Sequence, residues 1–420
     1  MVEVNGELLL VTHRDPIEWH GGGPTYVRSW ARAAQCLGIR PRIVTLSDRS
    51  EVRASPYGTV HRVRSPLGRT SSLTLSVTSP LLGRAALDIL ADRPGTHVVH
   101  GFSGWPRIPA GDVRAMADRG VTVRLVQTAW TTMRHEIAGK LASGEIAGSA
   151  RVKAWGEALW SRLANDRVQH SSFRDSSCVL VNYRTTERIL REQWPETAFA
   201  IRHMPYLAES AFDTGPLPTR SPDPSVEAVG APAPPMIVAM SRHTARKGLG
   251  VLIRALHLLS RRGIDFRACL PSGGPLLHSH RARVAQLGLA DRVMLPGLVD
   301  SPTDYIRAAD VFVLPSLEEG SGSVSVLEAL QATVPVVASD VDGMHEDITD
   351  DVDGILVPPG DASALAQAIQ DLITDPARRR RIALAGRRLY ERRFSPDVVV
   401  PAIGELYGEL GLLTDRDARH

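Results

Sequence analysis

Lysine is scarce in this sequence, and its apolar runs are all short. Of the 49 basic residues only Lys140, Lys153 and Lys247 are lysines, so arginine is the usual cation and each lysine is informative. No run approaches the roughly 18 apolar residues of a membrane-spanning helix. The formal net charge is only +3, which excludes a nucleic-acid or membrane partner that is bound through overall charge alone.

Cysteine is equally rare. Cys36, Cys178 and Cys269 lie far apart, in segments that are typical of helices or strands. This spacing argues against a disulfide framework and a zinc site, and we expect three buried thiols in a reducing compartment. Glu3 and Glu7 precede the first short apolar run, so we expect no signal peptide and a cytoplasmic protein.

The remaining composition is that of a folded chain long enough for two domains. Hydrophobic residues make up 43% and charged residues 23% of the 420 positions. Seven prolines occur in the 20 residues from Pro216 to Pro235, a density that neither a helix nor a central strand tolerates. We predict an N-terminal domain over residues 1–212, a Pro-rich linker over 213–235, a second domain over 236–395 and a C-terminal segment over 396–420.

Both predicted domains alternate short apolar strands with helices, the pattern of a parallel α/β sheet covered on both faces. The first domain has predicted strands Leu8–Val11, Arg42–Leu46, Thr96–His100, Val123–Thr128 and Cys178–Val181, and predicted helices Thr25–Leu37 and Thr185–Gln193. The second has predicted strands Met236–Met240, Phe266–Leu270, Arg292–Leu295, Val311–Leu314, Pro335–Ala338 and Gly354–Val357, and predicted helices Gly250–Arg262, Ser323–Ala332 and Pro376–Phe394.

Two arginine-rich segments allow more than one interpretation. Val60–Thr70 is expected to be a solvated loop, with contact to an acidic acceptor or a membrane as the alternative. Eight arginines lie between Arg378 and Arg393 on a helix that keeps an apolar stripe. We expect them to form a solvated face, with a nucleic-acid arm as the alternative.

The most informative motif runs from Leu314 to Leu330. A buried strand ends at Pro315, and the small residues Gly320–Ser323 then enter a helix. Small residues let a ligand approach the backbone, and the helix N-terminus presents free N–H groups that suit a diphosphate. Glu328 lies among apolar residues of that helix and therefore needs hydrogen-bond donors. A ribose diol and a nearby arginine both remain candidates for that partner.

Two further motifs follow strands. Arg242 and Lys247 come after the first strand of the second domain, five residues apart, so their charges can converge on one phosphate pair. The run His20–Thr25 holds three glycines, among them Gly22 and Gly23, between the first strand and the first helix. It is not a dinucleotide fingerprint, but it can line a sugar or phosphate site or serve only as a turn.

Taken together, these motifs resemble those of the retaining glycosyltransferases of the fourth sequence family, also called glycosyl transferases group 1. The resemblance covers nearly the whole chain and is strongest from Met236 to Asp361. It implies the α/β GT-B fold, in which two Rossmann-like domains face each other and a C-terminal helix crosses back to the first.

The resemblance also assigns roles. Arg242 and Lys247 would bind the donor diphosphate and Glu328 the ribose, while Glu319 would contact the donor sugar. Backbone amides of Gly322, Ser323 and Val324 would bind sugar hydroxyls, with the glycine loop at Gly22 and Gly23 nearby.

Two features depart from the family pattern. Eight residues separate Glu319 from Glu328 where the family usually has seven, which leaves Glu318 as an alternative to Glu319. The family histidine near the donor sugar is replaced by Trp130. An indole can stack on a pentose or deoxy sugar. Alternatively, Trp130 belongs to the core and His100 or His135 takes the polar role.

We therefore predict a retaining hexosyl- or pentosyltransferase that uses a nucleotide-diphosphate sugar and a small-molecule or glycoconjugate acceptor. Bacterial natural-product and glycoconjugate enzymes fit the arginine-rich composition. We expect no metal and no other cofactor, on the ground that no Asp-x-Asp follows a predicted strand, and no nucleic-acid partner. A nucleotide-sugar epimerase or hydrolase is the alternative enzyme, and a non-catalytic nucleotide-sugar-binding protein is the third possibility.

Overall fold

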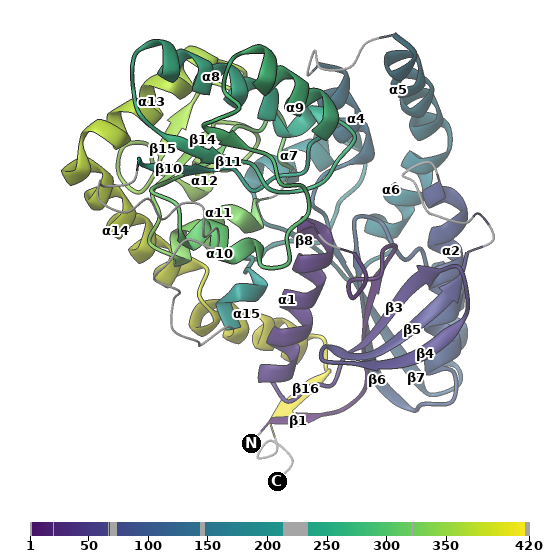
Figure 1. The fold of residues 1–420 in the computed structure, drawn as a ribbon. Coiled ribbons are helices and arrows are strands. Elements are labelled where there is room, and N and C mark those ends of the chain that lie inside the picture. Colours follow the sequence, from purple (N-terminus) through teal and green to yellow (C-terminus); the bar gives the residue numbers. More distant parts are fainter. Residues whose placement is uncertain are drawn as a thin grey trace. The chain divides into compact units, whose positions relative to one another are not determined.

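The computed structural model describes residues 2–19, 21–65, 67, 74–142, 148–212, 234–320 and 322–415 (Figure 1). The chain divides into two compact units. The N-terminal unit contains residues 1–138, 152–209 and 396–420, and the C-terminal unit contains residues 139–151 and 210–395. Most of the predicted Pro-rich linker, residues 213–233, lies outside the described residues, as does His20.

An eight-stranded sheet forms the centre of the N-terminal unit, with strand order β4-β5-β3-β2-β6-β7-β8-β9. All neighbours are parallel except β4 and β5, which form an antiparallel pair. The strands are β2 (Leu8–Thr12), β3 (Arg42–Ser47), β4 (Glu51–Ser55), β5 (Gly58–Arg64), β6 (Gly95–Phe102), β7 (Val121–Thr128), β8 (Cys178–Val181) and β9 (Ile201–His203). The helices are α1 (Gly22–Cys36), α2 (Leu75–Leu90), α3 (Ala110–Ala117), α4 (Met133–Ala142), α5 (Gly148–Trp160), α6 (Asp166–Arg174) and α7 (Arg184–Gln193). The end of α4 and the start of α5 fall in the segment 139–151, which belongs to the C-terminal unit.

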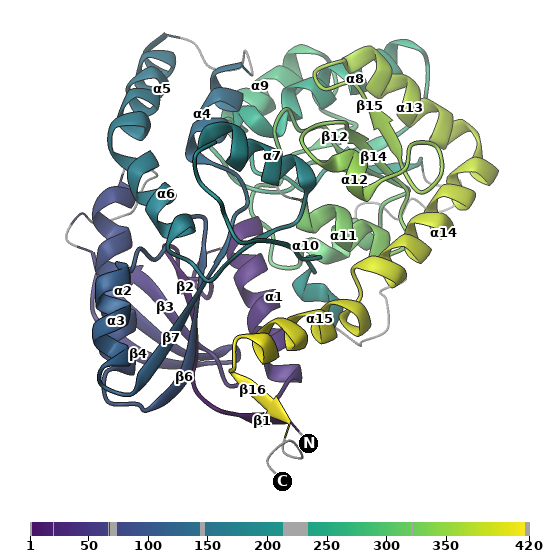
Figure 2. The ribbon, with the colours of Figure 1, turned by 180° about the vertical axis from the view of Figure 1, so that it is seen from behind.

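The C-terminal residues complete this unit. Helix α15 (Pro396–Glu409) packs against α1. Strand β16 (Leu413–Asp415) pairs antiparallel with β1 (Val2–Val4), so the two ends of the chain lie side by side (Figure 2). The C-terminal segment therefore belongs structurally to the N-terminal unit.

The C-terminal unit has a six-stranded, fully parallel sheet in the order β12-β11-β10-β13-β14-β15. Its strands are β10 (Met236–Val238), β11 (Arg267–Cys269), β12 (Val293–Met294), β13 (Val311–Leu314), β14 (Val336–Ser339) and β15 (Ile355–Val357). Its helices are α8 (Leu249–Arg261), α9 (Leu277–Gln286), α10 (Pro302–Arg307), α11 (Val324–Gln331), α12 (Met344–Asp347), α13 (Ala362–Thr374) and α14 (Pro376–Arg393).

The strand order of the second sheet fixes the place where a ligand would bind. The chain starts at β10, adds β11 and β12 on one side, and then returns to add β13 on the other side of β10. In open parallel sheets, ligands bind at the carboxyl ends of the strands where the order reverses. That point lies between β10 and β13, and the strands there are fully buried because helices cover both sheet faces.

Two expectations from the sequence are wrong. Residues 58–64 form strand β5 rather than part of a solvated loop, and Arg62 is buried, with ion pairs to Asp15, Glu18 and Glu51. The acidic partners of Arg62 lie in other segments of the sequence, so the local polar pattern around Arg62 does not indicate that it is buried. Arg69 lies outside the described residues. Cys36 is exposed at the end of α1, whereas Cys178 is half-buried and Cys269 is buried, and all three are free thiols.

The arginines of α14 serve the fold of their own unit. Arg378 and Arg381 pair with Asp351, and Arg387 donates to the backbone carbonyl of Gln331. Arg393 pairs with the buried Asp347. The sequence predicted a solvated arginine face, and these side chains are partly exposed but also paired within their own unit. Within the described residues, no helix is both long and apolar enough to span a bilayer.

Candidate functional site

The loops that follow β10 and β13 pack into one structural element at the carboxyl edge of the C-terminal sheet. The backbone N–H groups of Leu317 and Glu318 donate to the carbonyl of Arg246, at 2.8 and 3.2 Å. Gly248 has φ +61°, and a Cβ at this position would lie 1.9 Å from the Pro315 carbonyl oxygen. Only glycine therefore allows the two loops to approach this closely.

Lys247 and Glu319 form the centre of this element. The Lys247 ammonium lies 2.6 Å from both carboxylate oxygens of Glu319, and the Ser316 hydroxyl donates to the same carboxylate at 2.6 Å. The side chain of Glu319 is 5% exposed and that of Lys247 15%. Burial lowers the pKa of Lys247, and the nearby Glu319 charge opposes this shift. The sequence predicted both residues for the site but did not predict that they pair with each other.

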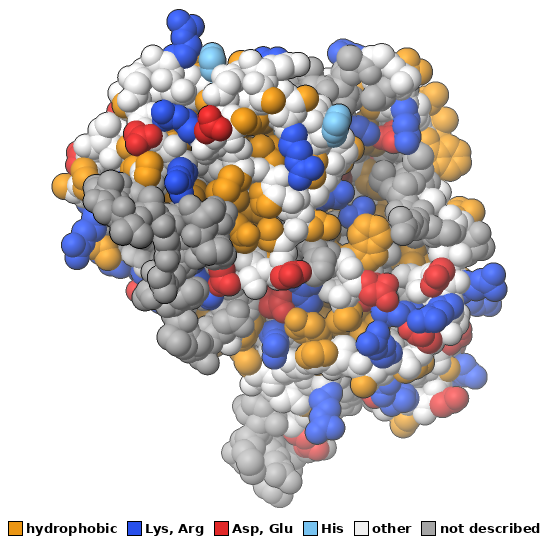
Figure 3. All heavy atoms as spheres, viewed as in Figure 1, with side chains coloured by type: hydrophobic (Ala, Val, Ile, Leu, Met, Phe, Trp, Pro, Cys, Tyr) orange, Lys and Arg blue, Asp and Glu red, His pale blue; other side chains and the backbone are white. Residues whose placement is uncertain are grey.

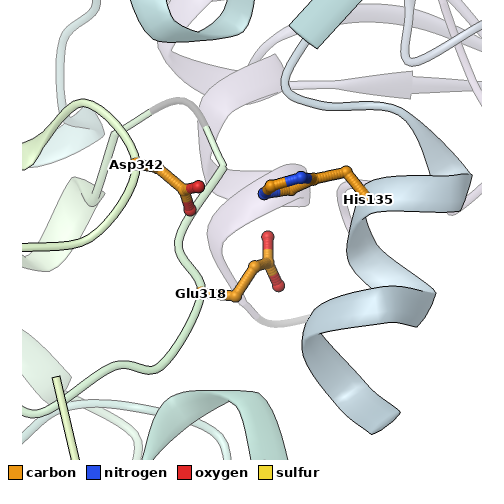
Figure 4. A group of neighbouring side chains, drawn as sticks. All are labelled: His135, Glu318 and Asp342. Atoms are coloured by element: carbon orange, nitrogen blue, oxygen red, sulfur yellow. The ribbon is translucent and has the colours of Figure 1, made fainter. Parts of the chain in front are cut away.

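A second ion pair lies beside them, and an aspartate holds the backbone of the loop that follows. The buried Glu318 accepts from Arg246 at 3.1 Å. Asp342, after β14, accepts from the backbone N–H groups of Glu319 and Gly320, both at 2.8 Å. Figure 4 shows Glu318 and Asp342, whose carboxylates lie within 4.8 Å of one another. His135, also labelled there, belongs to helix α4 of the N-terminal unit.

The expectation that no Asp-x-Asp follows a strand is wrong, because Asp340 and Asp342 directly follow β14. Asp342 holds the glycine loop through the two backbone contacts. Asp340 is half-exposed, and its carboxylate lies 2.9 Å from Nδ1 of His345. The predicted strand ended at Ala338, whereas β14 continues to Ser339, so Asp340 stands directly at its carboxyl end.

The glycine loop leads into helix α11. Gly320 and Gly322 both have positive φ angles, 74° and 90°, while Ser321 lies outside the described residues. Ser323 is the N-cap residue, but its hydroxyl lies 3.1 Å from the Ser325 hydroxyl and, within the described part of the chain, does not cap the first turn. The first turn of α11, with Val324 as its first residue, thus presents backbone N–H groups and the positive end of the helix dipole.

Arg242 lies on the same β10 loop as Lys247. Its side chain is exposed and makes no hydrogen bond or ion pair with the described residues. The next residue, His243, is fully buried, and its Nδ1 lies 2.8 Å from Nδ1 of His280 on α9. Nε2 of His243 lies 3.2 Å from the Leu270 carbonyl, which can only accept, so His280 is the donor within a neutral pair. This buried pair anchors the loop that carries Arg242, and sequence analysis did not identify it.

Glu328 is half-buried on α11 rather than enclosed in the apolar core. It lines a small pocket of the C-terminal unit together with Ser210, Thr303, Arg307, Gln331 and Ala332. Both partners that the sequence left open remain candidates, since Arg307 lines the same pocket and the carboxylate is not fully enclosed.

In the N-terminal unit, α1 begins at Gly22, three residues earlier than predicted. A Cβ on Gly23 would lie 3.1 Å from the Trp130 ring. The Trp130 indole stacks on Phe102 at 5.8 Å and meets the edge of Tyr26 at 5.5 Å between ring centroids. Its buried indole nitrogen has no hydrogen-bond partner among the described residues. The structure thus brings the glycine loop and Trp130 together.

His100 lies in the core of this unit. It is 0% exposed, with Nε2 2.8 Å from the Thr128 hydroxyl and Nδ1 3.3 Å from the Tyr407 hydroxyl. Trp30 and Phe102 enclose its ring, and burial lowers its pKa to about 3. The ring is enclosed and hydrogen-bonded within its own unit, and its role at the donor sugar stays a prediction.

Two family models match the chain. Residues 234–375 match the model described as glycosyl transferases group 1, and residues 21–200 match the glycosyl transferase 4-like domain. Together the two matched regions contain most of both units.

Relatives with known activities also match. The chain is 28% identical over 259 residues to an alpha-D-kanosaminyltransferase from Streptomyces kanamyceticus, which covers 61% of this chain and 66% of that protein. It is 34% identical over 182 residues to a GDP-mannose-dependent alpha-(1-6)-phosphatidylinositol monomannoside mannosyltransferase from Mycolicibacterium smegmatis, which covers 40% and 47%. The matched regions thus span about half to two thirds of these relatives.

Solved structures show the same fold. Sucrose-phosphate synthase from Thermosynechococcus elongatus superimposes with a TM-score of 0.72 at 22% identity, over 96% of this chain and 99% of that chain. Anabaena HepE in complex with UDP and glucose gives a TM-score of 0.64 at 16% identity, over 96% and 100%. The predicted α/β GT-B fold with two Rossmann-like domains is confirmed.

Proposed function

Because the chain belongs to the glycosyl transferases group 1 family, we propose that it transfers a sugar from a nucleotide-diphosphate sugar to an acceptor hydroxyl with retention of anomeric configuration. The observation that carries this proposal is the Lys247–Glu319 pair beside the first turn of α11, at the point where the strand order of the C-terminal sheet reverses. A cation, a carboxylate and free backbone N–H groups meet there, which are the groups that a sugar diphosphate requires.

Donor binding would break the contact between Lys247 and Glu319. A diphosphate competes with Glu319 for the Lys247 ammonium, because both are anionic hydrogen-bond acceptors. When Lys247 contacts phosphate, the Glu319 carboxylate is released toward the hydroxyls of the attached sugar. Ser316 and the two loop contacts of Asp342 keep the backbone of Glu319 in place during this exchange.

The leaving nucleotide diphosphate gains negative charge as the glycosidic bond breaks. Arg242, Lys247 and the first turn of α11 supply positive charge and N–H donors for it, so the proposed mechanism needs no metal ion. Glu318 and Asp342 are the acidic groups beside this site, and each already accepts hydrogen bonds from its own unit. Glu328, in its pocket with Thr303 and Gln331, is proposed to bind the ribose hydroxyls.

The donor and acceptor are proposed by class. The relatives include a kanosaminyltransferase and a GDP-mannose-dependent mannosyltransferase, and HepE was solved with UDP and glucose. Trp130 and the glycine loop are proposed to face the sugar or the acceptor, with Trp130 favouring a pentose or deoxy sugar over a hydroxyl-rich hexose.

The test is a transfer assay with UDP- and GDP-linked sugars and a pool of small-molecule and lipid-linked acceptors, followed by mass spectrometry. We expect a product that needs an acceptor, is formed in the presence of EDTA and keeps the donor's anomeric configuration by NMR. A changed or hydrolysed donor without an acceptor would instead indicate an epimerase or hydrolase. Binding without turnover of any donor would indicate a non-catalytic protein.

A further inference from the structure

Helix α5 and the π-helical turn that follows it (Ser161–Asn165) expose large apolar side chains. Val152, Trp155, Leu159 and Leu163 are 72%, 60%, 61% and 59% exposed. Their spacing of three, four and four residues places them along one side of the helix. Figure 3 shows hydrophobic side chains gathered over α5 at the upper right of that view. We call these four residues the α5 stripe.

The side of this segment that faces the protein is polar or small. Ala154, Ser161 and Asn165 are the buried residues, and Asn165 accepts from the backbone N–H of Ser76. A helix that packs for stability normally buries its large apolar residues and exposes its small or polar ones. Here the order is reversed, so the fold does not account for an outward tryptophan and two outward leucines.

The cations around the stripe indicate what covers it. Lys153 and Arg162 are exposed on the same segment, and Arg167 is exposed in the first turn of α6. An aromatic and aliphatic stripe bordered by Lys and Arg is the pattern of a helix that lies in the interface of an anionic lipid bilayer. In both ribbon views α5 continues α6 past helix α2 (Figures 1 and 2). The four side chains of the stripe are each more than half exposed.

We propose that the α5 stripe docks the N-terminal unit on a membrane that carries anionic phospholipid. Trp155, Leu159 and Leu163 enter the boundary between headgroups and acyl chains, and Lys153 and Arg162 contact lipid phosphates. This surface differs from residues 60–70, where the sequence allowed a membrane contact, and it does not depend on the proposed catalytic function.

The test is flotation of the full chain with phosphatidylcholine vesicles, with and without phosphatidylglycerol. We expect flotation with the anionic vesicles, weaker flotation at high salt, and a loss of about a hundredfold in Trp155→Ser/Leu159→Ser, because burial of each of the two large side chains is worth about tenfold. Lys153→Gln/Arg162→Gln should reduce the preference for phosphatidylglycerol. Val52→Ser, which changes another residue that is 67% exposed, is the matched control and should float as the wild type does.

A second measurement does not require the double variant to fold. Brominated lipids should quench tryptophan fluorescence of the wild type, and Trp155→Phe should lose most of that quenching. Absence of flotation or quenching, or equal flotation of wild type and Trp155→Ser/Leu159→Ser, overturns the proposal. Self-association of the wild type that the double variant abolishes, without vesicle binding, also overturns it and identifies a second copy as the occupant.

Discussion

The Lys247 ammonium contacts both carboxylate oxygens of Glu319 at 2.6 Å, across 72 residues of sequence, and both side chains are largely buried. Lys247→Ala should therefore lower the free energy of unfolding by about 3 kcal/mol, because it leaves a buried carboxylate without its cation. Lys247→Met/Glu319→Gln should recover most of that loss. Urea unfolding of the single and double variants measures both values, and a double variant as unstable as Lys247→Ala would contradict the pairing.

Glu328 is expected to act on the nucleotide rather than on the fold. Glu328→Gln should unfold as the wild type does but bind nucleoside diphosphate roughly tenfold or more weakly, since hydrogen bonds to a charged group contribute about 1.5–3 kcal/mol. A 2′,3′-dideoxy nucleotide should bind both proteins equally. Glu391→Gln on α14 is the control, because the side chain of this half-exposed glutamate pairs only with Arg387 in the described structure. Loss of stability in Glu328→Gln without nucleotide would support a structural ion pair instead.

The His243–His280 pair predicts acid sensitivity. Burial, with a contribution from His243, lowers the pKa of His280 to about 4, and burial also lowers the pKa of His243. Unfolding restores a pKa near 6.5, so the unfolded chain takes up protons between about pH 6.5 and 4. Stability should thus be complete above pH 6.5 and fall by about 1–3 kcal/mol as the pH drops through this window.

The difference between wild type and His280→Gln isolates that contribution from other buried histidines. The difference in unfolding free energy between wild type and His280→Gln should be smaller at pH 5 than at pH 7. His345→Gln, at a more exposed histidine that pairs with Asp340, should follow the wild type. Parallel curves for wild type and His280→Gln would show that the pair does not titrate as described.

Trp130→Phe separates packing from ligand contact. Phenylalanine keeps the aromatic contact with Phe102 and removes a buried indole N–H that has no partner among the described residues. Stability should change by less than about 1 kcal/mol, since a polar group without a partner contributes nothing favourable to folding. Turnover should nevertheless fall if the N–H binds a substrate hydroxyl. Unchanged kcat and KM with UDP-glucose and UDP-xylose would leave Trp130 with a packing role only.

Sequence patterns predicted the strands well where both sheet faces are covered, because such strands are continuous apolar runs, as at Val311–Leu314. They failed where stability comes from remote partners. Arg62 cannot be recognised as buried without knowing that Asp15 and Glu51 meet it. For the same reason the motifs located Lys247 and Glu319 but not their pairing. They also missed Asp342, which follows β14, and His280, which lies on α9. The sequence does not show that these elements pack beside the β10 and β13 loops, because that follows from the sheet topology.

The most direct test of the account is calorimetric titration of the full chain with UDP and GDP, in wild type and Lys247→Ala. The account predicts that one nucleotide binds the wild type, and that Lys247→Ala weakens it by roughly ten- to 150-fold, which corresponds to about 1.5–3 kcal/mol for a charged hydrogen bond. Lys153→Ala, at an exposed lysine on α5, is the matched control and should bind as the wild type does. The central claim is that Lys247 exchanges its contact with Glu319 for a contact with the donor diphosphate. Equal affinity of Lys247→Ala and wild type for the preferred nucleotide would contradict it.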